Sequence, residues 1–119
     1  MARILIAEDE PDIRELVAFT LRFAGHEVTP TANGEEALQQ ASVVIPDLIL
    51  MDVVMPGQNG FQLTRAISRD PLYADVPIIM CTSKNQETDR VWGMRQGARD
   101  YITKPVDATE LMAKIKALS

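Results

Sequence analysis

Groups that could do chemistry stand at the ends of four predicted strands in this sequence. Three carboxylates, a hydroxyl and an ammonium are placed in this way, on Glu8, Asp9, Asp52, Thr82 and Lys104. The runs before Glu8, Asp52 and Thr82 are short and apolar, as expected of strands that are buried on both faces. Because a carboxylate is costly inside such a sheet, we expect Asp52 to lie just at its rim.

Three carboxylates that gather on one rim need a partner to offset their repulsion. Two unit charges about 4 Å apart repel by about 4 kcal/mol at an effective dielectric constant of about 20. Mg²⁺ would offset this repulsion, since it binds one or two carboxylates together with waters and phosphate oxygens. With Mg²⁺ and Lys104 screening the charge, a carboxylate could attack a phosphoryl group while Thr82 donates to a phosphoryl oxygen.

Composition and charge narrow the class of protein. The 119 residues, 46% of them hydrophobic, predict a single globular domain that spans 1–119. The formal net charge of -5 argues against direct nucleic-acid binding, which needs a basic face. A single cysteine, Cys81, rules out a disulfide framework and favours a reducing compartment. We expect a cytoplasmic protein without membrane insertion, because no apolar run could span a bilayer and the N-terminus does not resemble a signal peptide.

The elements that must position the polar groups alternate between strand and helix. We expect strands at 3–7, 26–31, 47–52, 76–82 and 99–103. We expect helices that start at Pro11, Asn33, Phe61, Asn85 and Asp107, with Gly25, Pro46, Asp70 and Gly97 closing the first four. Such alternation predicts an α/β fold, in which helices cover both faces of a five-stranded parallel sheet. The carboxyl ends of its strands would then bring the polar groups together.

Local signals add detail to these elements. Pro30 places the second strand at an edge of the sheet. Asn33 and Asp107 are predicted helix caps. In the first helix a set of residues follows helical spacing: Ile13, Leu16, Val17, Thr20, Leu21 and Ala24.

Several short motifs, taken together and in this order, resemble a response-regulator receiver domain of bacterial two-component signalling. They are Glu8-Asp9, Asp52 with Met55-Pro56-Gly57 and Asn59-Gly60, Thr82-Ser83, Gly97-Ala98-Arg99-Asp100-Tyr101, and Lys104-Pro105. The resemblance covers the chain from end to end. Within the family, the segment 86–97 is most similar to single-domain receivers of type IV pilus and twitching-motility pathways.

The resemblance implies a flavodoxin-like, doubly wound fold with strand order 2-1-3-4-5. It implies that Asp52 accepts a phosphoryl group from a histidine kinase or a phosphotransfer protein, and that the chain catalyses only its own phosphorylation and dephosphorylation. Mg²⁺ would be held by Asp9, Asp52 and the carbonyl of Val54, while Glu8 would act through a coordinated water.

The resemblance also implies a switch and a cis peptide bond. Thr82 and Tyr101 would form the switch pair, with Tyr101 rotating inward once Thr82 is drawn to the phosphoryl group. The Lys104–Pro105 bond would be cis. The switch would remodel the surface of the fourth helix, fifth strand and last helix for an output protein that the sequence does not name.

The fourth helix holds the only tryptophan of the chain. We expect Val91 and Met94 on its inward side and Trp92 one step round, partly exposed. Trp92 either packs on a neighbouring helix or binds a partner, since tryptophan is enriched at binding hot spots. Arg90, Trp92, Met94 and Tyr101 are the candidate partner surface.

Two other classes of protein use similar features. A Mg²⁺-dependent phosphatase with an aspartyl nucleophile usually has a second acid two residues after that nucleophile, where this chain has Val54. A flavodoxin-like cofactor binder needs a phosphate loop with free backbone amides after the first strand. This chain instead has the acidic segment 8–12, which repels phosphate unless a metal intervenes.

Overall fold

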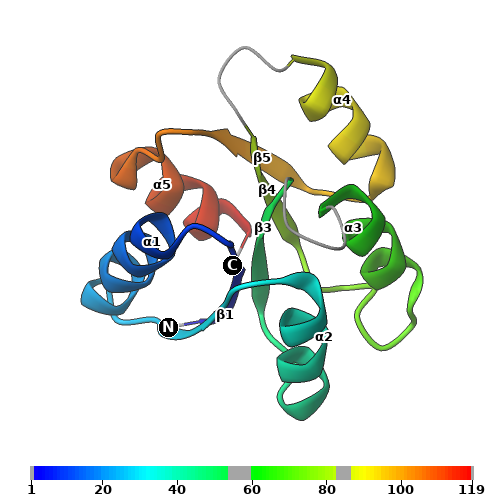
Figure 1. Ribbon diagram of the computed structural model, residues 1–119, viewed down its shortest axis with the longest axis horizontal. Coiled ribbons are helices and arrows are strands. Elements are labelled where there is room, and N and C mark those ends of the chain that lie inside the picture. The colour runs from blue at the N-terminus through cyan, green and yellow to red at the C-terminus, as the bar shows by residue number, and fades with distance from the viewer. Residues whose placement is uncertain (1, 54–59, 83–86, 119) are drawn as a thin grey trace.

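The computed structural model describes residues 2–53, 60–82 and 87–118 (Figure 1). Within these residues, five strands alternate with five helices along the chain. The strands are β1 (Arg3–Ala7), β2 (Glu27–Thr31), β3 (Leu48–Asp52), β4 (Ile78–Thr82) and β5 (Asp100–Thr103). The helices are α1 (Pro11–Phe23), α2 (Gly34–Val43), α3 (Gly60–Arg69), α4 (Glu87–Gln96) and α5 (Ala108–Leu118).

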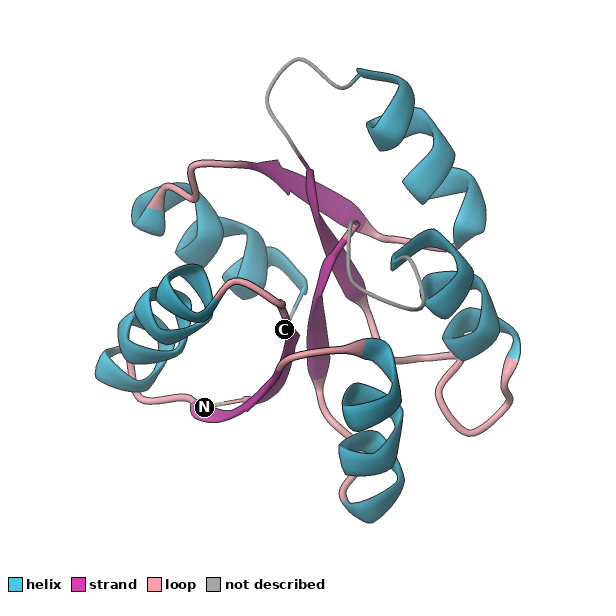
Figure 2. Cartoon of the chain, viewed as in Figure 1, coloured by secondary structure: helices cyan, strands magenta, loops and turns pink. Residues whose placement is uncertain are grey.

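The strands form one parallel sheet in the order β2-β1-β3-β4-β5, as the resemblance implied. Helices α1 and α5 cover one face, and α2, α3 and α4 cover the other (Figure 2). The predicted doubly wound α/β fold is therefore confirmed. Among the described residues, no helix is both long and apolar enough to cross a membrane.

The core has two halves because successive strand side chains point to opposite faces of the sheet. In β3, Leu48 and Leu50 pack beneath α1 and α5, whereas Ile49 and Met51 pack on the side of α2 and α3. Every residue of β3 is buried. Burying a side chain of this size stabilises the fold by about 1.5–3 kcal/mol, so the strand that ends in Asp52 is held firmly.

The helix ends agree with the predicted signals. The side chains of Asn33 and Asp107 each accept a hydrogen bond from the backbone N–H three residues later. Pro11 begins α1, and Gly25 and Gly97 have positive φ just beyond two helix ends. The edge position of β2, which contains Pro30, is also confirmed.

The predicted inward side of α4 is wrong, and the helical spacing in α1 matches its buried side only in part. In α1 the buried residues are Val17, Ala18 and Leu21, while Leu16 is 63% exposed. In α4, Val91 and Met94 are 43% and 45% exposed, not inward. The inward position is instead taken by Gly93, where a Cβ would collide with the thioether of Met80. Helix α4 therefore packs on the sheet through a position without a side chain, which leaves its apolar residues outside.

Candidate metal centre

The sheet register explains why the predicted groups meet. Ala7 pairs with Met51, so the residues that follow them in the chain, Glu8 and Asp52, lie at the same level of the rim. Thr82 pairs with Thr103 at the other side of β4, and the backbone N–H of Lys104 donates to the carbonyl of Thr82 (2.8 Å). The carboxyl ends of β1, β3, β4 and β5 thus surround one crevice, as predicted.

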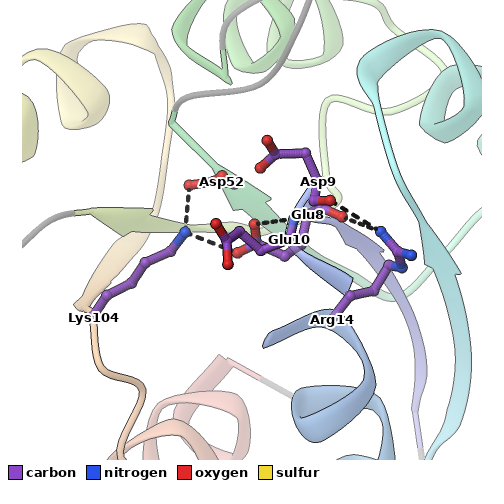
Figure 3. Close-up of polar contacts among 6 residues, drawn as sticks. All are labelled: Glu8, Asp9, Glu10, Arg14, Asp52 and Lys104. Carbon is purple, nitrogen blue, oxygen red and sulfur yellow. Dashed lines mark hydrogen bonds and ion pairs between the residues drawn. The ribbon is translucent and has the colours of Figure 1, made fainter. Parts of the chain in front are cut away.

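The three carboxylates form a compact cluster. One oxygen each from Glu8, Asp9 and Asp52 lies within 4.8 Å of the other two. Figure 3 shows the side chain of Lys104 reaching this cluster from β5. Its Nζ lies 2.9 Å from Glu8 Oε1 and 3.1 Å from Asp52 Oδ1. Lys104 therefore binds two carboxylates at once.

Because the crevice is buried, charged groups in it interact more strongly than they would in water. Glu8 is 4% exposed and Asp52 is 5% exposed. Burial, followed by the charge of Glu8, raises the pKa of Asp52 to about 7, although Lys104 opposes this shift. Burial alone would lower the pKa of Lys104, but its bonds to Glu8 and Asp52 outweigh that effect and raise it. Asp52 is thus poised between its neutral and ionised forms near neutral pH.

The donor set suits a hard divalent cation. All three clustered groups offer carboxylate oxygens, the ligands that Mg²⁺ prefers. A bound cation would stabilise the ionised form of Asp52 and so lower its pKa. The acidic cluster could therefore hold a metal ion.

Two hydroxyl residues of the predicted switch lie on neighbouring strands. Thr82 is buried at the end of β4, with 2% of its surface exposed. Tyr101 is partly buried on β5, and its hydroxyl accepts a hydrogen bond from Arg90 Nη1 (3.3 Å). The Arg90 guanidinium and the Lys114 ammonium each lie 5.2 Å from the centre of its ring. Tyr101 is therefore held between α4 and α5.

A groove lies beside Tyr101, with a volume of about 510 Å³. It is lined by Arg90, Val91, Met94, Arg95, Asp100 and Tyr101, and is called the α4–β5 groove below. Three residues of the candidate partner surface are in this lining. Trp92, 49% exposed as predicted, is not part of it.

Some predicted site residues lie outside the described residues. These are Val54, Met55, Pro56, Gly57, Asn59 and Ser83, and the predicted start of the fourth helix at Asn85. The predicted cis bond between Lys104 and Pro105 is present. Cys81 is buried and free, next to Asp52 in the register.

Sequence reasoning missed two features of the site. It did not pair Lys104 with Glu8, which depends on how far apart β1 and β5 lie in the folded sheet. It also missed Arg14, whose Nη1 donates to the carbonyls of Glu8 and Asp9 (2.9 and 3.4 Å; Figure 3). A single basic residue one helical turn after a run of acids was the only available signal.

Comparisons with known proteins agree with this site. A family model described as "Response regulator receiver domain" matches residues 4–116. Protein PilH of Pseudomonas aeruginosa is 48% identical over 99% of this chain and 98% of its own length. This likeness is in keeping with the predicted similarity to pilus-type receivers.

Two further proteins show the range of the similarity. The phosphate regulon transcriptional regulatory protein PhoB of Pseudomonas aeruginosa is 46% identical over 97% of this chain, which spans only 50% of PhoB. The structure of Vibrio cholerae chemotaxis protein CheY4 has a TM-score of 0.93 and 33% identity, covering 100% of this chain and 99% of that one.

These findings do not favour a phosphatase or a flavodoxin-like cofactor binder. Members of the matched family are signalling proteins rather than classical enzymes. The matched residues cover β1 from Ile4, the other four strands and α5 as far as Lys116. They include Glu8, Asp9, Asp52 and Lys104. The chain belongs to the response-regulator receiver domain family.

Proposed function

We propose that residues 1–119 act as one receiver domain in which Asp52 accepts a phosphoryl group in a Mg²⁺-dependent reaction. A carboxylate oxygen of Asp52 would attack the phosphorus of a phosphohistidine. The P–N bond would break, the imidazole would leave with its electron pair, and Asp52 would become an acyl phosphate. The observation that supports this proposal is a buried acceptor carboxylate with two further carboxylates and one ammonium within reach.

Each neighbouring residue has a separate proposed role. Mg²⁺, held by Asp9, Asp52 and the Val54 carbonyl, with Glu8 acting through a water, would neutralise charge that gathers on the phosphoryl oxygens. Lys104, which already contacts Asp52, would keep this contact or pass it to a phosphoryl oxygen. The hydroxyl of Thr82 would donate to another phosphoryl oxygen. Positioning and charge stabilisation are the main needs of phosphoryl transfer, so no further general base is required.

The proposed output is a two-state switch. Phosphorylation replaces the single negative charge of the Asp52 carboxylate with a phosphoryl group that carries about two, and Thr82 would be drawn toward this group. Tyr101 would then leave its contact with Arg90 and turn inward, which would change the lining of the α4–β5 groove. Moving the equilibrium from 1:99 to 99:1 needs about 5.5 kcal/mol of differential stabilisation. Contacts of Thr82 and Lys104 to the phosphoryl oxygens in this largely buried crevice are the proposed source.

The proposed partners are proteins. A histidine kinase or a phosphotransfer protein would supply the phosphoryl group, and an output protein would bind the surface of α4, β5 and α5. The net charge of -5 disfavours direct nucleic-acid binding by this domain. A free, buried Cys81 agrees with a reducing compartment, and the cytoplasm is the proposed location.

Incubation with acetyl phosphate tests the proposal, because it needs no knowledge of the kinase. Mass spectrometry of the intact protein should find one added phosphoryl group when Mg²⁺ is present. The D52N variant should gain none. Full labelling of D52N would refute the assignment of the acceptor.

A further inference from the structure

Arg14 binds three carbonyls in a row. Its Nη1 donates to the carbonyl of Glu8 (2.9 Å) and, at longer range, to that of Asp9 (3.4 Å). Its backbone N–H donates to the carbonyl of Glu10 (2.9 Å). The segment Glu8–Glu10, called the acidic turn below, thus has all of its carbonyls directed at one residue of α1. In Figure 3 the side chain of Arg14 lies on the far side of this turn from Asp52 and Lys104.

The acidic turn lacks the usual support of a helix start. Glu10 is the N-cap of α1, but its side chain makes no capping hydrogen bond. Pro11 follows, and it has no backbone N–H to donate. The backbone N–H of Glu8 donates to Thr31 on β2 (3.0 Å), which fixes only the beginning of the turn. Among the described residues, the chain through Asp9 is therefore held by Arg14 together with one hydrogen bond inside the turn, from the Glu10 N–H to Glu8 Oε2.

The two carboxylates of the turn differ in how they are held. Glu8 Oε2 accepts a hydrogen bond from the backbone N–H of Glu10 (3.2 Å), and Glu8 Oε1 pairs with Lys104. Across residues 2–53, 60–82 and 87–118, by contrast, no hydrogen bond or ion pair reaches the carboxylate of Asp9. Among these residues, it is therefore the backbone of the acidic turn that orients this carboxylate. A change in the turn would hence move the Asp9 oxygen relative to Asp52.

A positively charged residue is unexpected next to a predicted cation site. A guanidinium repels a divalent cation, so by Coulomb's law alone its presence weakens cation binding at the neighbouring cluster. Its contacts are with carbonyls and not with the clustered carboxylates. The advantage of having an arginine here must then be geometric. Both donations come from one nitrogen, Nη1, which the planar guanidinium holds in a fixed direction, whereas the ammonium of a lysine is a point charge on a flexible stem.

We propose that Arg14 is a positioning residue for the metal centre, which holds the acidic turn so that Asp9 and Glu8 face Asp52. This inference rests on the proposed Mg²⁺-dependent function. It assigns Arg14 no contact with the cation or the phosphoryl group. Removal of groups that orient metal ligands typically lowers metal affinity by about 10–100-fold.

Three variants separate geometry from charge. R14M removes both the charge and the donors, and R14K keeps the charge but not the planar guanidinium that holds Nη1 in place. R22M is the matched control, since Arg22 lies in the last turn of the same helix and its Nη2 also donates to a backbone carbonyl, that of Val28 (3.3 Å). Mg²⁺ affinity is measured by calorimetry above the pH of about 7 at which Asp52 titrates. The free energy of unfolding is measured without metal.

Affinity for Mg²⁺ should fall about tenfold in R14M, fall less in R14K and stay unchanged in R22M. If charge were the whole role, R14M would bind Mg²⁺ more tightly than the wild type, and the proposal would be overturned. Unchanged affinity in R14M, with only a loss of stability, would overturn it too. Should R14M fail to fold, wild-type affinity in R14K would be the contradicting result.

A metal-free measurement distinguishes failure of this inference from failure of the proposed function. Amide hydrogen exchange at Glu10, whose N–H donates to Glu8 Oε2, reports the order of the acidic turn without Mg²⁺. Exchange should be faster in R14M than in R22M. If the wild type binds no Mg²⁺ but this difference is present, the proposed function fails while Arg14 still holds the turn. Equal exchange in both variants would refute the role of Arg14.

Discussion

The carboxylate of Asp52 lies 3.1 Å from the ammonium of Lys104, and the two side chains are only 7% and 23% exposed. The proposed acceptor is thus paired before any phosphoryl group arrives. Because Glu8 shares the same ammonium, one cation offsets two buried acids. Removing one partner from such a group leaves a buried charge without a counter-charge. The resulting loss of stability is larger than the net stabilisation that the intact pair provides.

Lys104 should therefore contribute strongly to stability in the absence of metal. We expect K104M to lower the free energy of unfolding by about 3 kcal/mol, measured by urea denaturation. K114M is the matched control, because Lys114 pairs with Asp100 at 2.9 Å in a more exposed setting. That variant should lose about 1 kcal/mol or less. Equal losses in the two variants would mean that the Lys104 pairs are not effectively buried.

Asp52 should make stability depend on pH. Its pKa is about 7 in the folded protein against an ordinary value of 3.8, so between these values the folded state holds the extra proton. The resulting stability is fully present below pH 3.8 and is lost as the pH rises through about 7.

The D52N variant isolates this effect, since its amide cannot ionise. Relative to the wild type, D52N should gain on the order of 2–4 kcal/mol in the free energy of unfolding as the pH rises over this window. Saturating Mg²⁺ should reduce the difference, because it stabilises the ionised carboxylate. A difference that does not change with pH would show that burial does not raise the pKa of Asp52.

Gly60 should be essential for the position of the acceptor. Its N–H donates to the carbonyl of Val53 (2.8 Å), and a Cβ there would collide with the backbone carbonyl of Asp52. We expect G60A to lower the free energy of unfolding by about 1–3 kcal/mol and also to weaken Mg²⁺ binding.

G25A is the control for that substitution. Gly25 has a φ of 95° and open space where a Cβ would lie, so alanine there strains the backbone without a collision and away from Asp52. It should lower stability without changing Mg²⁺ affinity. Normal Mg²⁺ affinity in G60A would show that the start of α3 does not position the metal site.

Tyr101 should transmit the signal without taking part in phosphorylation. Trp92 is the only tryptophan of the chain and lies on α4, half exposed, so its fluorescence reports changes around that helix. Beryllofluoride with Mg²⁺, as a mimic of the phosphoryl group, should change the emission of the wild type. In Y101A the change should be much smaller, while the rate of phosphorylation by acetyl phosphate stays the same. Loss of phosphorylation in Y101A would mean that its role is misassigned.

Much of the fold was predictable because its signals are local. The apolar runs before Asp52 and Thr82 predict buried strands, and Pro11, Asn33 and Asp107 mark helix starts. In parallel strands these local signals suffice to place the polar residues on one rim. The acceptor cluster was therefore predicted from residue types and order.

The errors concern faces and partners, which depend on three-dimensional packing. Helical spacing shows that Val91 and Met94 share a side of α4, but not that Gly93 occupies the contact with Met80. Leu16 fits the helical spacing too, but it is exposed because Val17, Ala18 and Leu21 already fill the buried side of α1. Arg14 escaped notice because it binds backbone carbonyls, which have no pattern in a sequence.

The most direct test of the account is the site and the metal dependence of phosphorylation. The protein is incubated with acetyl phosphate, with Mg²⁺ or with a chelator, and the labelled peptide is identified by mass spectrometry. We predict a single phosphoryl group on Asp52 with Mg²⁺, little without it, and none in D52N. Labelling that is independent of Mg²⁺, or that lies on a residue other than Asp52 in the wild type, would contradict the central claim.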